Sequence, residues 1–119
     1  ILYGQIDLIL EDENEIQIID LKTGKYDEFE YSSNYRQQLS LYKLLLQKKY
    51  DKDIRTYLYY LEEEEPKKEI LITDEELEED FKNINKTTQD ILDNKFPKIP
   101  YNHNICGICE FKNYCWGLE

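Results

Sequence analysis

Apolar and polar residues alternate along the first part of the chain in a pattern that predicts two neighbouring strands. Residues 1–10 are rich in leucine and β-branched residues, and an acidic stretch separates them from a second such run at residues 15–23. A short polar stretch between two strand-like runs is typical of a tight turn. We therefore expect a β-hairpin over the first 23 residues.

Helical spacing replaces this alternation in the next part of the chain. Asn34 and Gln37 resemble a capping box, and the apolar residues that follow recur at helical intervals. This predicts a helix of about 15 residues. Residues 54–61 are apolar at both odd and even positions, as in a strand covered on both faces, and residues 69–73 can return as its neighbour.

A second helix is predicted to begin at Thr73, with Glu76 three residues later completing a capping box. Pro97 and Pro100 are expected to end it. The tail that follows has no clear periodicity, and we expect His103, the only histidine, to lie in a loop. The apolar residues expected along one side of this helix are Leu77, Phe81, Ile84, Ile91 and Leu92.

Charged residues interrupt the second strand near its end, in the sequence "IIDLKTG" at residues 18–24. Side chains alternate along a strand, so Ile16, Ile18, Asp20 and Lys22 share one face. That face runs from apolar residues into polar ones. We infer that the strand leads out of the core into a functional site.

A second carboxylate, Asp7, lies on the first strand, which we expect to be partly buried. If residue 12 pairs with residue 15 across the turn, position 7 falls opposite Asp20, with Cβ atoms roughly 5 Å apart. Two such carboxylates repel each other unless a cation compensates them, and magnesium takes oxygen ligands of this kind. Lys22 would then serve a water molecule or a phosphate. The alternative is a plain salt bridge between Asp20 and Lys22, and Asp7 favours the metal site.

The charge of the chain is strongly negative, at −11, which opposes binding to a polyphosphate. The distribution of charge softens this objection, because residues 22–55 contain 8 basic and 5 acidic side chains. The acidic residues elsewhere gather in runs that are typical of solvated turns and outer helix faces. Charge therefore leaves a nucleic-acid partner open.

The first predicted helix carries an amide among apolar neighbours. Tyr35, Gln38, Leu39, Tyr42 and Leu46 fall on one stripe, so Gln38 is expected to point inward. A buried amide needs hydrogen-bond partners. Gln38 either binds backbone groups of the core, with Tyr42 as a core residue, or belongs to the site.

Taken together, these motifs resemble the PD-(D/E)xK nuclease superfamily, and in particular its RecB-like branch. "GQIDLI" and "IIDLKTG" match a Gly-x-x-Asp strand followed by an Asp/Glu-x-Lys strand, and "QLSLY" at residues 38–42 matches the helix motif of that branch. Many members also end in a CxxC followed by a third cysteine, as here. The match extends in order from Gly4 to Cys115.

The resemblance implies an α/β fold with a mixed central β-sheet flanked by helices, a restriction-endonuclease-like core. It implies a nuclease core over residues 1–99 and a cysteine-containing tail over residues 100–119. The implied reaction is metal-dependent hydrolysis of DNA, an exonuclease activity in the full-length protein. By the same resemblance, Asp7 and Asp20 are ligands of magnesium or manganese, and the backbone carbonyl of Leu21 is a further ligand. Lys22 lies beside the attacking water. Gln38 and Tyr42 lie near the substrate phosphate or the lysine.

Three cysteines, Cys106, Cys109 and Cys115, have a spacing that lets three thiolates converge on one metal centre. Spacing alone does not separate zinc from iron–sulfur. The resemblance favours a four-iron, four-sulfur cluster (4Fe-4S) whose fourth ligand is an upstream cysteine of the full-length protein. In the 119-residue chain such a cluster is expected to be absent or labile.

The chain begins at Ile1 and contains no methionine, so we interpret it as an N-terminally truncated fragment. Members of this branch usually carry an upstream helix with another ligand, so the fragment alone is expected to be inactive. Implied hosts are DNA-repair helicase-nucleases of the AddB or UvrD-like type, with a helicase domain in the same chain or complex, or CRISPR-associated exonucleases.

Apolar runs are too short for a membrane span, and we expect a soluble, cytoplasmic protein with DNA as its partner. Two alternatives to a nuclease stay open. One is a non-catalytic interaction module in which the cysteines hold zinc. The other is a nuclease fold retained only to bind DNA.

Overall fold

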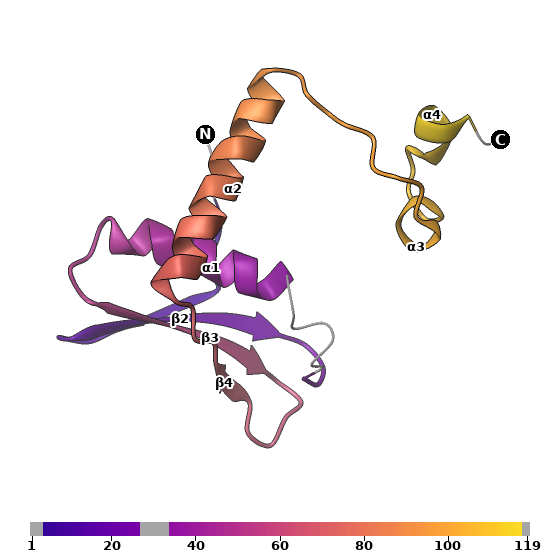
Figure 1. Ribbon diagram of the computed structural model, residues 1–119. Helices are drawn as coiled ribbons and strands as arrows, with labels where there is room; N and C mark the ends of the chain where they lie inside the picture. The colour runs from indigo at the N-terminus through magenta and orange to yellow at the C-terminus, as the bar shows by residue number, and fades with distance from the viewer. Residues whose placement is uncertain (1–3, 27–33, 118–119) are drawn as a thin grey trace. The chain divides into compact units, whose positions relative to one another are not determined.

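The computed structural model describes residues 4–26 and 34–117 (Figure 1). Within residues 1–84, which form one of two structural units, lies a four-stranded mixed sheet with the order β1-β2-β3-β4. β1 pairs with β2 and β3 with β4 in antiparallel fashion, whereas β2 and β3 are parallel. The strands are β1 (Leu8–Glu11), β2 (Glu15–Lys22), β3 (Asp53–Tyr60) and β4 (Lys67–Glu69).

The β1–β2 hairpin has the register expected from the sequence. Leu8 lies opposite Ile19, and beyond the last strand pair the Asp12 N–H donates to the Glu15 carbonyl over 3.1 Å. The Asp12 carboxylate accepts hydrogen bonds from the N–H groups of Asn14 and Glu15, at 2.8 and 2.9 Å. An aspartate that binds its own turn in this way fixes the turn and hence the pairing.

The first strand is shorter and more exposed than the sequence indicated. Residues 4–7 precede β1 and pair with no strand, and residues 1–3 lie outside the described residues. Leu8, Ile9 and Leu10 are 39, 44 and 47% exposed. The expectation of a partly buried first strand was wrong, because β1 lies at the edge of the sheet, beyond the strands that helix α1 contacts.

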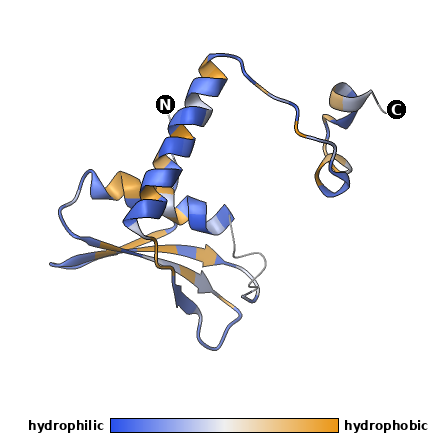
Figure 2. Ribbon diagram, viewed as in Figure 1, coloured by the Kyte–Doolittle hydropathy of each residue, from blue (hydrophilic) through white to orange (hydrophobic). Residues whose placement is uncertain are grey.

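Helix α1 (Asn34–Gln47) connects the two parallel strands and lies across one face of the sheet (Figure 1). A parallel pair needs a crossover connection of this kind. Figure 2 shows hydrophobic positions concentrated on α1 and the central strands, where the core forms. The core cluster consists of Ile16, Ile18, Leu39, Tyr42, Ile54, Leu58, Tyr60, Ile70, Ile72 and Leu77.

The segment at residues 69–73 was expected as a strand, but β4 ends at Glu69. The Ile70 N–H still donates to the Thr56 carbonyl over 2.8 Å. The Ile70 carbonyl accepts instead from the Thr56 hydroxyl, at 2.6 Å, so a side chain replaces the next backbone bond of the ladder. Ile70 and Ile72 remain buried although the strand has ended.

Helix α2 (Asp74–Leu92) begins with the capping box that the sequence predicted. The Thr73 N–H donates to Glu76 Oε2 over 2.8 Å, and the Glu76 N–H donates to Thr73 Oγ1 over 3.3 Å. Arg36 of α1 reaches Glu76 Oε1 at 2.5 Å and the Leu71 carbonyl at 2.6 Å. The start of α2 is therefore tied to α1.

The apolar side expected along α2 is only partly buried, and Figure 2 shows most of this helix as hydrophilic. Leu77 is buried, whereas Phe81, Ile91 and Leu92 are exposed. The helix also ends earlier than the prolines suggested, because Asn94 adopts a φ of 54°. Asparagine tolerates this left-handed conformation, which stops a helix before any proline is reached.

The second unit comprises residues 85–119 and contains two short helices, α3 (His103–Cys106) and α4 (Lys112–Trp116). His103 was expected in a loop but is the first residue of α3, because the Asn102 side chain accepts from the N–H groups of two following residues and caps the helix. The Tyr101 and Trp116 rings meet edge to face at 5.5 Å. No helix within 4–26 and 34–117 has both the length and the apolar character needed to span a membrane.

Candidate active site

The polar end of β2 is the centre of the candidate site. Asp20 continues the inward face of Ile16 and Ile18 and is only 5% exposed. Lys22 is two residues further along the same face and is half-buried, with its Nζ 2.5 Å from Asp20 Oδ2. The strand thus carries a buried carboxylate and an adjacent ammonium out of the core.

Asp7 approaches the same strand end from the neighbouring chain segment. It is exposed and lies just before β1, rather than on a partly buried strand as the sequence indicated. Its Oδ2 accepts a hydrogen bond from the Leu21 N–H over 2.9 Å. The hairpin register and this bond place the Asp7 carboxylate beside Leu21, which lies between Asp20 and Lys22 in the strand.

The donor set at this end of the hairpin fits a hard divalent cation. Asp20 Oδ2 is buried, and no donor of the described residues meets it in hydrogen-bonding geometry, although Lys22 Nζ is close. Within the described part of the chain, no group of three or more His, Cys, Asp or Glu side chains gathers as metal ligands. Two carboxylates suffice for magnesium when water and substrate phosphate supply the other ligands.

The two residues of the helix motif bind each other and the segment that carries Asp7. Gln38 Nε2 donates to Tyr42 Oη over 3.1 Å, and the Tyr42 hydroxyl donates to the Gln5 carbonyl over 2.5 Å. A Cβ on Gly4 would lie 3.0 Å from Tyr42 Cε1, so the tyrosine ring packs directly against the backbone there. Tyr42 therefore holds the Gly4–Asp7 segment against α1.

The side chain of α1 that contacts the lysine is Tyr35. Its ring centroid lies 3.7 Å from Lys22 Nζ. Sequence reasoning placed Tyr35 on the stripe that contains Gln38 but assigned it no role. The available signal was its position three residues before Gln38, on the helix face directed at the polar end of β2.

The turn after β3 fixes the end of β2 from the other side. The Leu61 N–H donates to the Lys22 carbonyl over 3.0 Å. The Tyr26 N–H donates to Glu63 Oε1 over 2.9 Å, and the Tyr26 and Tyr60 rings meet edge to face at 5.4 Å. The backbone that carries Lys22 is therefore held on both sides.

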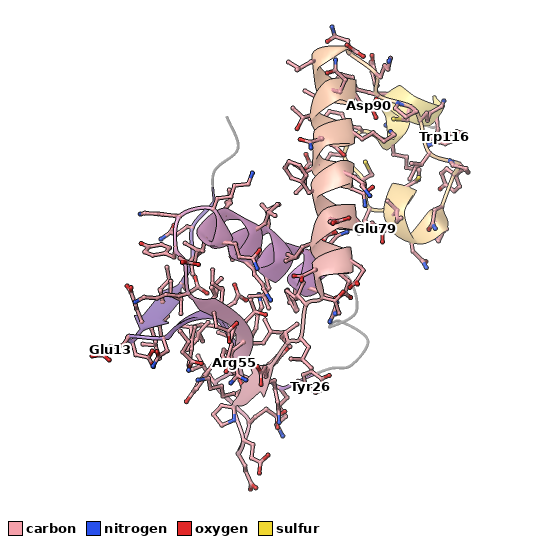
Figure 3. The ribbon with its side chains drawn as sticks, turned by 60° about the vertical axis from the view of Figure 1, so that its left-hand side comes forward. Glu13, Tyr26, Arg55, Glu79, Asp90 and Trp116 are labelled. Atoms are coloured by element: carbon pink, nitrogen blue, oxygen red, sulfur yellow. The ribbon has the colours of Figure 1, made fainter. Side chains whose placement is uncertain are left out.

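The three cysteines lie in the second unit, where all three line one cavity of about 790 Å³. Trp116, which Figure 3 labels, lines the same cavity. Cys106 is buried, Cys115 half-buried and Cys109 exposed, and all are free thiols. Within the described residues they do not gather into a three-ligand group for a metal ion. The described part of the tail therefore holds no preformed metal centre.

Comparison with known proteins identifies a family for this chain. The family model described as PD-(D/E)XK nuclease superfamily matches residues 1–116, nearly the whole chain. No curated protein matches the sequence, and no solved structure matches it either. The mixed four-stranded sheet with flanking helices is consistent with the α/β fold of that superfamily. The chain therefore belongs to the PD-(D/E)XK nuclease superfamily.

Proposed function

We propose that this chain is the catalytic part of a metal-dependent nuclease that hydrolyses phosphodiester bonds of DNA. Membership of the superfamily indicates nuclease activity. The observation that carries the proposal is the meeting of three groups at one end of the hairpin. These are the buried Asp20, the Lys22 ammonium 2.5 Å from it, and the Asp7 carboxylate bound to the intervening peptide.

Asp7 and Asp20 would hold magnesium or manganese, with the Leu21 carbonyl as a further ligand. Nucleases of this superfamily usually use such divalent metals. A divalent cation bound there supplies Lewis acidity at the phosphate and lowers the pKa of a bound water. The hydrogen bond from the Leu21 N–H to Asp7 holds that carboxylate at the strand end before the cation arrives.

Lys22 supplies positive charge where negative charge develops on the phosphate during hydrolysis. Its half-buried side chain keeps the ammonium in a partly desolvated position, where such a charge acts more strongly than in water. The adjacent carboxylate and the turn after β3 both limit the movement of this residue. Lys22 can also orient the water that attacks the phosphate.

Gln38 and Tyr42 serve the site by fixing the segment that carries Asp7. The bond from the Tyr42 hydroxyl to the Gln5 carbonyl ties that segment to a core helix, and Gln38 orients the hydroxyl. This supports a positioning role for both residues and leaves the amide of Gln38, half-buried, near the substrate side.

The substrate follows from the superfamily, whose fold implies DNA. We propose an exonuclease of DNA repair, in the cytoplasm, with a helicase domain in the same chain or complex. Residues 1–99 would form the nuclease core and residues 100–119 the cysteine-containing tail. We propose further that in the full-length protein a fourth cysteine completes a 4Fe-4S cluster with Cys106, Cys109 and Cys115, whose spacing lets three thiolates share one centre.

The experiment that tests the proposal measures cleavage of DNA by the full-length protein with magnesium, for the natural protein and two variants. Asp20→Asn removes the buried carboxylate charge and should abolish cleavage. Asp53→Asn is the matched control, because Asp53 is an exposed aspartate at the opposite end of the sheet and pairs with Glu15 in the register. Its activity should be unchanged.

Crystals of the natural protein soaked in manganese provide a measurement independent of activity. An anomalous peak is expected between Asp7 and Asp20 and should be lost in Asp20→Asn. A protein that binds DNA but neither cleaves it nor binds manganese at this position is a DNA-binding module. Binding of zinc alone by the cysteines, with no cleavage, would indicate the interaction module instead.

A further inference from the structure

Tyr35 contacts Lys22 from a fixed position. Its ring centroid is 3.7 Å from Lys22 Nζ, and its ring packs against the hydrophobic core from the first turn of α1. A cation over the face of an aromatic ring is attracted by the ring quadrupole. Packing against the core fixes the orientation of the ring. It therefore also fixes the position at which the ring attracts the ammonium.

Among the described residues, two groups of different chemistry contact the Lys22 ammonium. One is Asp20 Oδ2 at 2.5 Å, whose attraction depends on its negative charge. A divalent cation bound to Asp20 compensates that charge and also repels the ammonium. The attraction of an aromatic ring does not depend on Asp20 and survives the arrival of the cation.

We propose that Tyr35 is a positioning residue that keeps the Lys22 ammonium at the site once a divalent cation occupies Asp20. This inference rests on the proposed function. The side chain of Lys22 is 17% exposed, so a route to solvent is open to it. Holding a long flexible side chain in one conformation costs entropy, and an ammonium repelled by a cation would leave without a second contact. The Tyr35 ring supplies that contact.

The test compares variants of the full-length protein that differ only in the aromatic ring. Tyr35→Leu removes the ring, whereas Tyr35→Phe keeps it and loses only the hydroxyl. Tyr50→Leu is the matched control, because Tyr50 is also half-buried, packs against the same core and has a lysine, Lys49, over its ring at 5.1 Å. Thermal unfolding of both leucine variants separates lost packing from lost positioning.

The first measurement is the proton chemical shift of the Lys22 ε-methylene group, in protein labelled with ¹³C-lysine, with and without magnesium. A ring this close moves the resonance upfield. The upfield shift should persist with magnesium in the natural protein and in Tyr35→Phe, and it should be absent in Tyr35→Leu. A natural protein that loses the shift when magnesium binds would overturn the proposal.

The second measurement is steady-state cleavage of DNA. Tyr35→Leu should lower kcat by about 3- to 30-fold, the range of a cation–π contact converted into rate, while KM stays unchanged. Tyr35→Phe should restore kcat, and Tyr50→Leu should leave it unchanged. Equal losses of kcat in Tyr35→Leu and Tyr50→Leu would mean that lost packing, and not positioning, explains the effect.

Failure of the proposed function gives a different result. If the natural protein does not cleave DNA, or if Lys22→Ala cleaves as well as the natural protein, Lys22 has no catalytic role. If Lys22→Ala is inactive while Tyr35→Leu is fully active, only the role of Tyr35 is refuted.

Discussion

Asp20 is a buried carboxylate whose partners explain its place in the strand. Burial of a charge is costly unless it is paired, and Lys22 Nζ at 2.5 Å supplies the pairing within the chain. No donor of the described residues meets its Oδ2 in hydrogen-bonding geometry. A divalent cation bound there would satisfy this oxygen, which the ion pair with Lys22 does not do in hydrogen-bonding geometry.

The charge of Lys22 is expected to act mainly on the transition state. Lys22→Ala in the full-length protein should reduce kcat for DNA cleavage by a factor on the order of 100 to 1,000 or abolish cleavage, with folding and DNA binding largely intact. Lys82→Ala, which removes an exposed lysine of α2, is the control. Undiminished cleavage by Lys22→Ala would remove this residue from the mechanism.

A glycine is needed at position 4 because the Tyr42 ring packs against its backbone, and not because of its backbone conformation. In Gly4→Ala the new Cβ would lie 3.0 Å from Tyr42 Cε1, so either the ring or the Gly4–Asp7 segment must shift. We expect cleavage to fall by up to about 100-fold, because the carboxylate of Asp7 moves with that segment. Gly24→Ala serves as the comparison, because nothing lies within 4 Å of the position that its Cβ would take. The φ of Gly24 is 90°, so any loss of activity in that variant reports backbone strain and not a steric clash. Activity of Gly4→Ala equal to that of the natural protein would contradict the role given to the Tyr42 contact.

At the scale of elements, charged capping residues connect the helices. Glu76 accepts from the Thr73 N–H at the start of α2 and pairs with Arg36 of α1. Both contacts need the ionised carboxylate. The hydrogen bond from the Thr73 backbone, followed by that from Arg36, holds the pKa of Glu76 below its ordinary value.

This lowered pKa predicts a dependence of stability on pH. A carboxyl group whose folded pKa is depressed contributes stability that is fully present above its unfolded pKa, near 4.5, and is lost as the pH falls through the folded value. Glu76→Gln should therefore lower the Tm at pH 7 and flatten its decline below pH 4.5. The control is Glu79→Gln on the outer side of α2 (Figure 3), which should leave both unchanged. Parallel Tm curves for Glu76→Gln and the natural protein would contradict the assignment.

At the scale of the whole molecule, the sequence predicted the parts of the fold that local pattern determines. The hairpin register, α1, β3 and the capping box of α2 follow from alternation, helical spacing and turn residues, and the structure confirms them. The membership of the nuclease superfamily is likewise confirmed. Local pattern was enough because each of these features depends on residues close together in the chain.

The predictions that were wrong concern features that depend on contacts between distant segments. The exposure of β1 depends on which strands α1 covers, and the early end of β4 depends on the Thr56 hydroxyl. The contact of Tyr35 with Lys22 was missed for the same reason, since it joins a helix to a strand across a crossover. The catalytic and metal-binding roles of the site residues stay predictions.

The cysteines give a prediction for the full-length protein. Purified without oxygen, it should be brown and contain iron and sulfide, because the proposed 4Fe-4S cluster contains both and absorbs visible light. Cys109→Ser should lose both colour and iron, whereas Ser40→Cys, which adds a buried thiol on α1, should retain them. Zinc in place of iron in the anaerobic sample would overturn the cluster and leave the nuclease proposal standing.

The parallel pairing of β2 with β3 has a consequence for the order in which the site is assembled. The β1–β2 hairpin closes over a short turn, but Lys22 pairs with Tyr60 only after the segment that includes α1 has folded back. Non-local pairing of this kind forms late in folding. In pulsed amide hydrogen exchange during refolding of the intact protein, the Leu61 N–H that binds the Lys22 carbonyl should therefore become protected later than the Ile19 N–H, which lies opposite Leu8 in the hairpin. The catalytic geometry around Lys22 would then be completed only after the hairpin that carries it has formed.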